Sequence, residues 1–381
     1  MIRNKVKDDT DFRMLFLQPQ PCVRTLKYAK ALKHYLGKRV SLCLGYTGYS
    51  LNRIYGYGDE YFDRMVHLNP KDVHNDILDI IDDFKPMLVH SHNAPNTLTL
   101  SAIRVCENIP VIHDVHEVLS VHKSGFFGDD DETTMTKYCD EERMANEQSD
   151  KRIYATEGIK DYIKNHYSVD AGDDLIFHNY VSESIMPTDF KEKLSNRDGE
   201  THIVYIGCVT SVVEDSHYDL REIFKDIADN QIHIHIYPTK NIITQSSHSY
   251  KKLDDASEFI HLHNNLSRRN LLQEITQYDF GWAGLNRAAN NKHLEIVLPN
   301  KVTEYIASGL PVLAFPHKTI KMFIKKNDVG LTFSNIDDLK SLLEKPEVSK
   351  MRENTLLVRH HLTIEKQIPK LVNFYERIIN N

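Results

Sequence analysis

The order of short apolar runs and amphipathic segments constrains this chain most. Runs that suit buried strands alternate with segments whose apolar residues recur at helical spacing, and the series occurs twice in 381 residues. The first series runs from Met14–Leu17 to Asp174–Phe177, and the second runs from Thr201–Ile206 to Val312–Phe315. Such alternation is typical of parallel sheets with helices on both faces. The sequence therefore predicts two consecutive Rossmann-like α/β domains.

A polar stretch separates the two series. It holds Pro187 and an Asn-Arg-Asp-Gly run at 196–199, and both are turn and linker signals. We predict an N-terminal domain over residues 1–185, a linker over 186–200 and a C-terminal domain over 201–355. The remaining residues, 356–381, contain an amphipathic helix at about Thr363–Ile379.

Composition excludes several classes of protein. With 41% hydrophobic and 27% charged residues the chain suits a soluble globular protein. No run approaches the roughly 18 apolar residues of a membrane span, and the N-terminus has no apolar signal stretch. Five scattered cysteines favour a reduced, cytoplasmic compartment. The net charge of -7 gives no general attraction to nucleic acid.

The first 40 residues are nevertheless basic, with ten Lys or Arg against three Asp. Arg24, Lys27, Lys30 and Lys33 recur on one face of a predicted helix, Val23–Leu36. Two interpretations remain open for this face. It is either an ordinary solvated surface or a peripheral contact with the anionic inner face of a membrane.

The segment Leu298–Phe315 carries the most specific pattern in the chain. Pro299 suits the first turn of a helix, Asn300 can cap one, and Gly309 stops it. The pattern predicts a helix over about 300–308, followed directly by a buried strand. The free N–H groups and partial positive charge at the start of such a helix suit a diphosphate.

Two charged side chains extend this predicted site. Lys301 adds positive charge at the start of the helix. Glu304 would be repelled by a phosphate, so its natural partners are two ribose hydroxyls, which can donate to its two oxygens. The alternative is an ordinary surface helix of an αβ unit.

The run Asn300-Lys-Val-Thr-Glu-Tyr-Ile-Ala-Ser-Gly-Leu-Pro-Val-Leu-Ala resembles the P-x-K-x-x-E-Y-x-A-x-G-x-P-V segment of GT-B glycosyltransferases, particularly the retaining family 4 group. The resemblance implies two Rossmann-like domains facing a central cleft, with the final helix crossing back to the N-terminal domain. It also implies that Glu304 binds the nucleotide ribose. The family commonly has a second glutamate eight residues earlier, near the donor sugar, where this chain has Ile296. Neighbouring Glu295 is therefore the candidate for that role.

The charge that would stabilise a departing diphosphate is less clear from the sequence. Gly207 ends a predicted strand, and without a side chain there the backbone can approach a phosphate. The family usually has an arginine and a lysine in or just after this loop, but residues 207–217 contain neither. We expect Lys301 and the helix amides to supply the charge, with Arg287 as the second candidate.

Histidines follow two strands of the first series. The run Ile112-His113-Asp114-Val-His116-Glu117 resembles the P-V-V-x-x-x-H-D/E segment of the same family, in which the histidine faces the donor sugar. By this resemblance His116 orients the sugar and is the candidate catalytic residue. A second group, His90-Ser-His92-Asn93, is either an acceptor-side lining or a solvated polar loop.

Two rival functions stay open. A metal hydrolase could use His90, His92, His113, Asp114 and His116 as Zn or Mn ligands, although it leaves 298–315 unexplained. A nucleotide-sugar epimerase, or a non-catalytic relative of the transferases, would share the GT-B architecture.

The sequence thus favours a glycosyltransferase that moves a sugar from a nucleotide diphosphate, most simply a UDP-sugar, to a saccharide or lipid-linked saccharide. Retention of anomeric configuration is expected from the resemblance. No metal and no further cofactor is required if amides and cations neutralise the diphosphate.

Overall fold

The computed structural model describes residues 12–380 except 122–131, 212–215, 240–244 and 288–290. The chain forms two compact units. Unit 1 comprises Met1–Asn179 and Gln367–Asn381, and unit 2 comprises Tyr180–Lys366. Segment 186–200, predicted as a linker, lies in unit 2. There the Leu194 amide donates to the Gln277 carbonyl at 3.0 Å.

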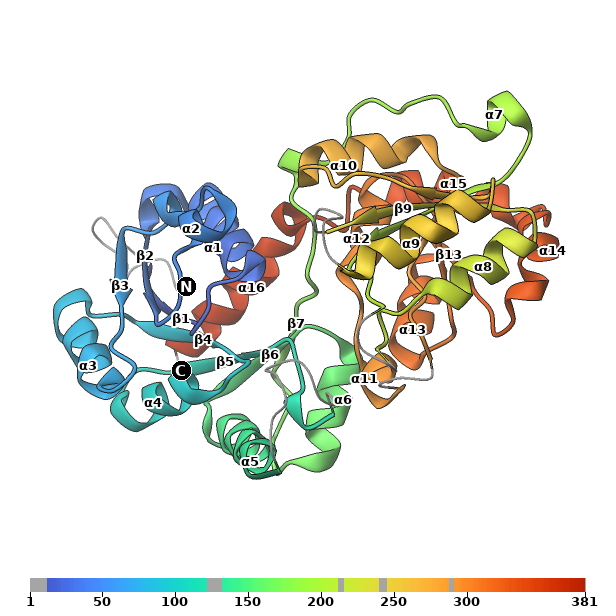
Figure 1. Cartoon of the computed structure of the whole chain (residues 1–381). Coiled ribbons are helices and arrows are strands. Elements are labelled where there is room, and N and C mark those ends of the chain that lie inside the picture. Colours follow the sequence, from blue (N-terminus) through green and yellow to red (C-terminus); the bar gives the residue numbers. More distant parts are fainter. Residues whose placement is uncertain (1–11, 122–131, 212–215, 240–244, 288–290, 381) are drawn as a thin grey trace. The chain divides into compact units, whose positions relative to one another are not determined.

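Unit 1 is built on a seven-stranded sheet in the order β3-β2-β1-β4-β5-β6-β7 (Figure 1). All its strand pairs are parallel, and the order matches a doubly wound Rossmann sheet. The strands are β1 Phe12–Leu17, β2 Val40–Tyr46, β3 Arg64–His67, β4 Leu88–His92, β5 Val111–Val115, β6 Lys151–Tyr154 and β7 Leu175–Ile176.

Helices cover both faces of this sheet, because its strands are apolar on both sides. Side chains of α3 and α4 share one core cluster with Leu15, Val89 and Val111. On the opposite face, Tyr28 of α1 and Tyr375 of α16 both contact His90. The helices with unit 1 residues are α1 Val23–Leu36, α2 Leu51–Tyr55, α3 Val73–Phe84, α4 Thr97–Val105, α5 Glu132–Gln148, α6 Glu157–His166 and α16 Ile364–Ile379.

Unit 2 is built on a six-stranded parallel sheet in the order β10-β9-β8-β11-β12-β13. Separate apolar clusters cover its two faces. The strands are β8 His202–Gly207, β9 His233–Pro238, β10 Ile260–Leu262, β11 Phe280–Trp282, β12 Val312–Ala314 and β13 Gly330–Thr332. The helices are α7 Ser195–Asp198, α8 Arg221–Asp229, α9 Gln245–Ala256, α10 Arg268–Glu274, α11 Asn291–Ile296, α12 Asn300–Ala307, α13 Lys318–Asn327, α14 Leu339–Leu343 and α15 Glu347–Val358.

Every strand that the sequence predicted is present, whereas β3 and β13 were not predicted. Both are short strands at a sheet edge, where a strand needs no continuous apolar run. The predicted helix over 300–308 is α12. Pro299 occupies the N-cap position of α12, and Asn300 is the first residue of the helix. The expectation that Asn300 caps the helix is therefore wrong.

Tyr305 attaches α12 to the sheet. Its hydroxyl accepts from the Ile206 amide at 3.0 Å and donates to the Trp282 carbonyl at 2.8 Å, so it bridges β8 and β11. Its ring lies over Gly281, where a Cβ atom would stand 2.1 Å from the ring carbon Cγ. A glycine at this position therefore fixes how closely α12 approaches the strands.

We predict that Gly281→Ala destabilises unit 2 by about 1–3 kcal/mol, the usual cost of forcing an extra methyl group into a packed core. Urea unfolding followed by circular dichroism measures the loss. Gly172→Ala is the matched control, because there a Cβ would meet only Asp170 Oδ1 at 3.3 Å. Equal stability of the two variants would contradict the packing argument.

Candidate functional site

In unit 2, the carboxyl end of β8 meets the start of α12. Lys301 lies in the first turn of α12, and its Nζ is 3.9 Å from the centre of the Tyr205 ring. Gly207, the last residue of β8, has φ +140°, and a Cβ there would stand 3.1 Å from Lys301 Nζ. The missing side chain at Gly207 is thus what leaves room for the lysine.

Lys301 is buried, and its Nζ has no hydrogen-bond partner among the described residues. Burial lowers the pKa of this amine to about 7, although the nearby Cys208 and Glu304 favour the charged form. A buried ammonium without a partner is costly. The arrangement suits a group that receives its counter-charge from an anionic ligand, and the positive end of the α12 dipole lies beside it.

Glu304 lies one turn further along α12 and forms an ion pair with Arg268, through Oε1 and Nη2. Arg268 is the first residue of α10, which follows β10. Arg268 Nε is buried without a hydrogen-bond partner among the described residues. The sequence predicted Glu304 but missed Arg268, whose only signal was its place at the start of a predicted helix.

The other predicted donor-site residues, Glu295 and Arg287, contact other groups of unit 2. Glu295 accepts a 2.7 Å hydrogen bond from the Lys318 amide and lies 3.2 Å from His317 Nδ1, so its carboxylate holds the start of α13. The guanidinium of Arg287 stacks on the Phe315 ring at 4.2 Å.

An apolar pocket lies at the carboxyl ends of β11 and β12. It reaches Pro299, the residue directly before α12, and it is lined by Ala283, Gly284, Leu285, Leu294, Val297, Pro299, Ala314, Phe315, His317 and Ile320. Its volume of about 10 Å³ has room for about one water molecule, so a nucleobase does not fit it in this conformation.

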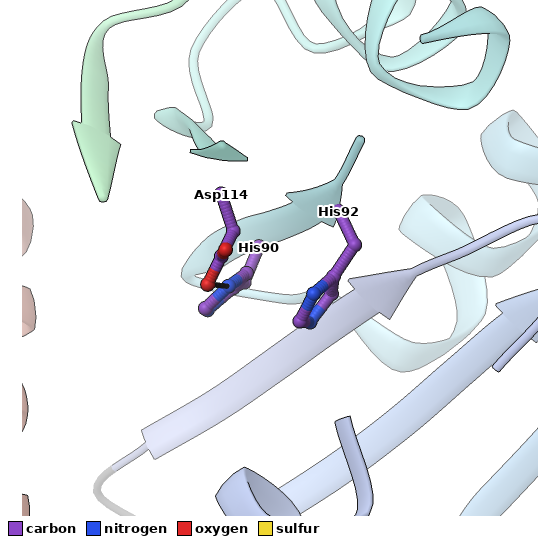
Figure 2. Close-up of side chains that lie close together, drawn as sticks. All are labelled: His90, His92 and Asp114. Atoms are coloured by element: carbon purple, nitrogen blue, oxygen red, sulfur yellow. Dashed lines mark hydrogen bonds and ion pairs between the residues drawn. The ribbon is translucent and has the colours of Figure 1, made fainter. Parts of the chain in front are cut away.

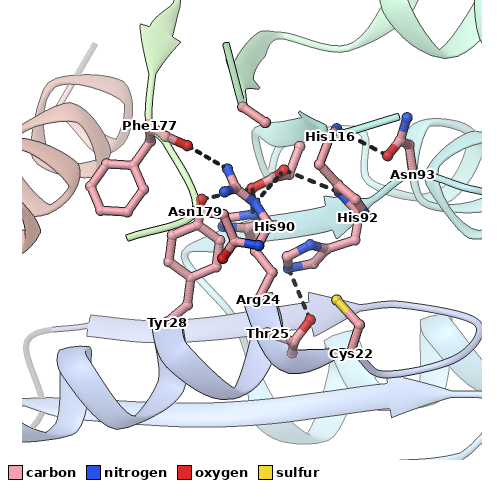
Figure 3. Close-up of polar contacts among 12 residues, drawn as sticks. Cys22, Arg24, Thr25, Tyr28, His90, His92, Asn93, His116, Phe177 and Asn179 are labelled. Carbon is pink, nitrogen blue, oxygen red and sulfur yellow. Dashed lines mark hydrogen bonds and ion pairs between the residues drawn. The ribbon is translucent and has the colours of Figure 1, made fainter. Parts of the chain in front are cut away.

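In unit 1, a buried carboxylate is the centre of the polar contacts at the ends of β4 and β5 (Figure 3). Asp114 accepts from Arg24 Nε at 3.0 and 3.1 Å and from the Tyr28 hydroxyl at 2.9 Å. His90 Nε2 lies 3.2 Å from it, and the other ring nitrogen of His90 lies 2.6 Å from the Tyr375 hydroxyl. This network joins α1, β4, β5 and α16.

Burial would raise the pKa of Asp114, but the charge of Arg24 and hydrogen bonds from His116 and His90 outweigh it and hold that pKa well below its usual range. Burial lowers the pKa of His90 and lowers that of His92 further. Asp114 is therefore ionised, and both of these histidines are neutral at physiological pH.

Several polar atoms near this network are buried without a partner among the described residues. They are His92 Nδ1, both side-chain polar atoms of Asn96, and Glu117 Oε2. Burial also raises the pKa of Glu117. Unsatisfied buried groups are rare and need an explanation, and a ligand rich in hydroxyl groups would satisfy them.

His116 lies at the rim of this group. Its Nδ1 is 3.4 Å from Asp114 Oδ1, its amide donates to Asn93 Oδ1 at 3.1 Å, and its side chain is 18% exposed. Asn93 also donates to the Glu117 carbonyl. The structure thus brings His90, His92 and His116 together, as the strand ends suggested.

The metal-hydrolase interpretation required His113 in the same group, and the structure places it elsewhere. His113 and Asp114 are neighbours in β5, so they point to opposite faces, and His113 Nδ1 lies 3.3 Å from Thr99 of α4. One ligand atom from each of His90, His92 and Asp114 lies within 4.8 Å of the others (Figure 2). Arg24 already neutralises Asp114, however, so the residues present fit a metal ion poorly.

The expected basic face of α1 is wrong for two of its four members. Arg24 is 3% exposed and Lys27 is 8% exposed, because Arg24 compensates Asp114 and Lys27 donates to Asn179 at 3.1 Å. Lys33 forms an ion pair with Asp63 at 2.5 Å. Of the basic residues that precede α1, those in 1–11 lie outside the described residues.

We predict that Lys301→Met stabilises the protein by about 1 kcal/mol. Relief of a buried unpaired donor is worth about 1–3 kcal/mol, and loss of the contact with Tyr205 takes back about 0.5–2 kcal/mol. Urea unfolding measures the difference. A clear loss of stability would mean that the ammonium has a partner in solution.

We also predict that Asp114→Asn costs unit 1 about 3–5 kcal/mol, because it leaves Arg24 buried without its counter-charge. Asp63→Asn serves as the exposed counterpart and should cost less than about 1 kcal/mol, since Asp63 is 46% exposed. Unfolding midpoints of the two variants test this, and similar losses would refute the prediction.

No helix within the described part of the chain is long and apolar enough to cross a membrane. None of the curated proteins compared with the chain matches it in sequence. Among solved structures, a glycosyltransferase from Rickettsia africae ESF-5 is similar over 97% of this chain and 99% of that chain, with a TM-score of 0.68 and 13% identity.

Two further structures show the same architecture. Anabaena Alr3699/HepE in complex with UDP has a TM-score of 0.69 and 11% identity, covering 95% of this chain and 99% of that chain. A putative UDP-N-acetylglucosamine 2-epimerase from Listeria monocytogenes has a TM-score of 0.57 and 12% identity, covering 91% of each chain. At such identities the likeness establishes the fold alone. Both units together have the GT-B fold, and residues 221–368 match the family described as glucosyltransferase 3-like, C-terminal domain.

Proposed function

We propose that the protein is a glycosyltransferase that uses a nucleotide-diphosphate sugar. The observation that carries the proposal is the buried amine of Lys301, which lacks a hydrogen-bond partner among the described residues and lies against Gly207 at the start of α12. A diphosphate bound there would be stabilised by the lysine charge and by the positive end of the α12 dipole. The matched glucosyltransferase 3-like domain includes this helix.

Glu304 and Arg268 are proposed to bind the nucleotide beyond the diphosphate. Arg268 holds Oε1 of Glu304, which fixes the direction of the carboxylate and leaves Oε2 to accept from a ribose hydroxyl. UDP is the first nucleotide to test, because two of the similar structures, HepE and Staphylococcus aureus MnaA, contain it.

In the transfer step, negative charge grows on the diphosphate as the bond to the sugar breaks. A cation placed beforehand in a buried site stabilises that charge without reorganisation. Lys301 meets this requirement, because Gly207 and Tyr205 hold it at one place. We therefore assign it the leaving-group role without a metal ion, and we give Arg287 and Glu295 no direct contact with the diphosphate.

In unit 1, we propose that His116 and the unsatisfied atoms of His92, Asn96 and Glu117 bind sugar hydroxyls. His116 is the candidate catalytic residue, because it is the exposed member of the Asp114 network. His116 Nδ1 faces Asp114 Oδ1 at 3.4 Å, and Nε2 is the ring nitrogen proposed to contact a sugar hydroxyl. Retention of configuration and a saccharide or lipid-linked acceptor are part of the same proposal, as is action in the cytoplasm or at the inner membrane face.

An epimerase is the second candidate, since epimerase structures have the same fold. It is supported less, because the glycosyltransferase from Rickettsia africae is more similar to this chain than the Listeria epimerase is, with TM-scores of 0.68 and 0.57. The two functions differ in product. A transferase passes the sugar to an acceptor or to water and releases the nucleoside diphosphate, whereas an epimerase yields the epimeric nucleotide sugar.

The test is calorimetric titration of UDP, GDP, ADP and CMP into the protein with EDTA present. We expect one diphosphate to bind without metal, and Glu304→Gln to weaken it by roughly tenfold, the effect of one lost charged hydrogen bond. Lys301→Met should weaken it at least as much while the fold stays intact.

Arg287→Gln is the matched control and should leave nucleotide affinity unchanged, because Arg287 stacks on Phe315. With the identified nucleotide sugar, His116→Ala should lower turnover while nucleotide affinity is kept. Failure of all four nucleotides to bind, or unchanged affinity in both Glu304→Gln and Lys301→Met, would remove the proposed donor site.

A further inference from the structure

Five histidines share one face of the unit 2 sheet, near its β10 edge. They are His202 of β8, His233 and His235 of β9, His261 of β10 and His263 directly after it. Neighbouring rings stack in parallel: His202 on His233 with centroids 4.5 Å apart and planes 5° apart, and His235 on His261 at 4.4 Å and 18°. A row of this kind needs an explanation, because apolar side chains would pack a sheet face at less cost.

The rings form two hydrogen-bonded chains, and each chain ends at a carboxylate. In the first, Asp198 Oδ2 lies 3.0 Å from His202 Nε2, His202 Nδ1 lies 2.9 Å from His235 Nε2, and His235 Nδ1 lies 3.0 Å from His263 Nε2. If each ring is neutral and carries its proton on Nε2, every one of these contacts has one donor and one acceptor.

The second chain follows the same rule. Glu200 contacts His233 Nε2, and His233 Nδ1 lies 2.9 Å from His261 Nε2. The Nε2 atoms of His202 and His233 are therefore the ends of the two chains, and both point toward carboxylates.

A tight turn brings the two carboxylates to these ends. Gly199 has φ +80°, a left-handed conformation that suits glycine, and it separates Asp198 from Glu200. The Glu200 amide donates to Asp198 Oδ1 at 2.9 Å, which closes the turn. Asp198 is 43% exposed and Glu200 is 49% exposed. Within the described residues, neither forms an ion pair with a lysine or arginine.

From this geometry we propose that unit 2 has a site for a divalent transition-metal ion of the zinc class. The ligands are Nε2 of His202, Nε2 of His233 and the carboxylates of Asp198 and Glu200. One ligand atom each from Asp198, His202 and His233 lies within 4.8 Å of the other two, so small side-chain rotations bring them to one ion. Imidazole with carboxylate suits zinc, cobalt, nickel and copper, whereas magnesium and calcium prefer all-oxygen sites.

The remaining histidines orient the two imidazole ligands. When Nε2 of His202 binds a metal ion it loses its proton, so Nδ1 must carry one and donate to His235 Nε2. His235 then donates through Nδ1 to His263, and His233 does the same toward His261. Metal binding thus moves each ring to its other tautomer without breaking a hydrogen bond between rings. Partners of this kind on the second nitrogen are typical of metal-binding histidines.

This site is separate from the proposed nucleotide site. His202 is the first residue of β8 and Gly207 is its last, so the two sites lie at opposite ends of the strand. A metal ion here would link the turn after α7 to the first residues of β8 and β9. Its role is therefore structural, and its presence does not depend on the proposed function.

The test is titration of the tag-free, EDTA-treated full chain with Co²⁺, followed by its visible absorption and by displacement with Zn²⁺. We expect one Co²⁺ per chain with the absorption of a low-symmetry nitrogen and oxygen site. The double variant Asp198→Asn with Glu200→Gln should bind at least about tenfold more weakly, and His233→Asn should abolish the spectrum.

Two matched controls belong to the same unit. Glu192→Gln removes an exposed carboxylate that pairs with Arg197, and His248→Asn removes an exposed histidine of α9; both should bind Co²⁺ as the parent does. The carboxylate double variant tests the site even if His233→Asn fails to fold, since both carboxylates are exposed. Absence of binding by the parent protein, or equal binding by the double variant, would overturn the proposal.

Discussion

The contact on which the proposed nucleotide site depends is the hydroxyl of Tyr305 between β8 and β11. It accepts from the Ile206 amide and donates to the Trp282 carbonyl, so it stands between two backbone groups of adjacent strands. This fixes α12 against the carboxyl ends of the sheet, with Gly281 making room for the ring. Lys301 and Glu304 are carried on the same short helix, so their positions follow from that contact.

The two units differ in the partners that surround their buried charges. In unit 1 the carboxylate of Asp114 contacts the guanidinium of Arg24, the Tyr28 hydroxyl and the His90 ring, which makes the network a structural centre as well as a sugar-binding candidate. In unit 2 the ammonium of Lys301 has only an aromatic ring and the helix start. A satisfied buried charge holds elements together, whereas an unsatisfied one costs stability and is retained where a ligand completes it.

The histidines of unit 2 add a third arrangement, in which neutral rings satisfy one another. Burial lowers the pKa of His202 and His263, and it lowers that of His261 to about 4. Neutral imidazoles are what a transition metal requires. The same row therefore serves as sheet packing without a metal ion and as a set of ligands with one.

The sequence by itself determined the two parallel sheets, because strand and helix periodicities are local properties of the chain. It also determined the short helix at 300–307 with Lys301 near its start, since Pro299 and Gly309 mark its ends. It predicted that His90, His92 and His116 follow the ends of strands, as candidates for sugar contacts or, in the metal-hydrolase alternative, as metal ligands. His113 and Asp114 are adjacent in a predicted strand, so the sequence already indicates that their side chains point to opposite faces of the sheet. This alternation argues against a metal site that uses both residues.

Only the tertiary structure decided which charges meet. The sequence predicts Arg24 on a basic surface, whereas in the structure it is buried against Asp114, 90 residues away in sequence. Glu295, predicted to lie near the donor sugar, accepts from the start of α13, and Arg268 was not predicted as the partner of Glu304. Such pairs join elements distant in the chain, and a charged residue has the same local pattern whether its partner is solvent, substrate or another side chain.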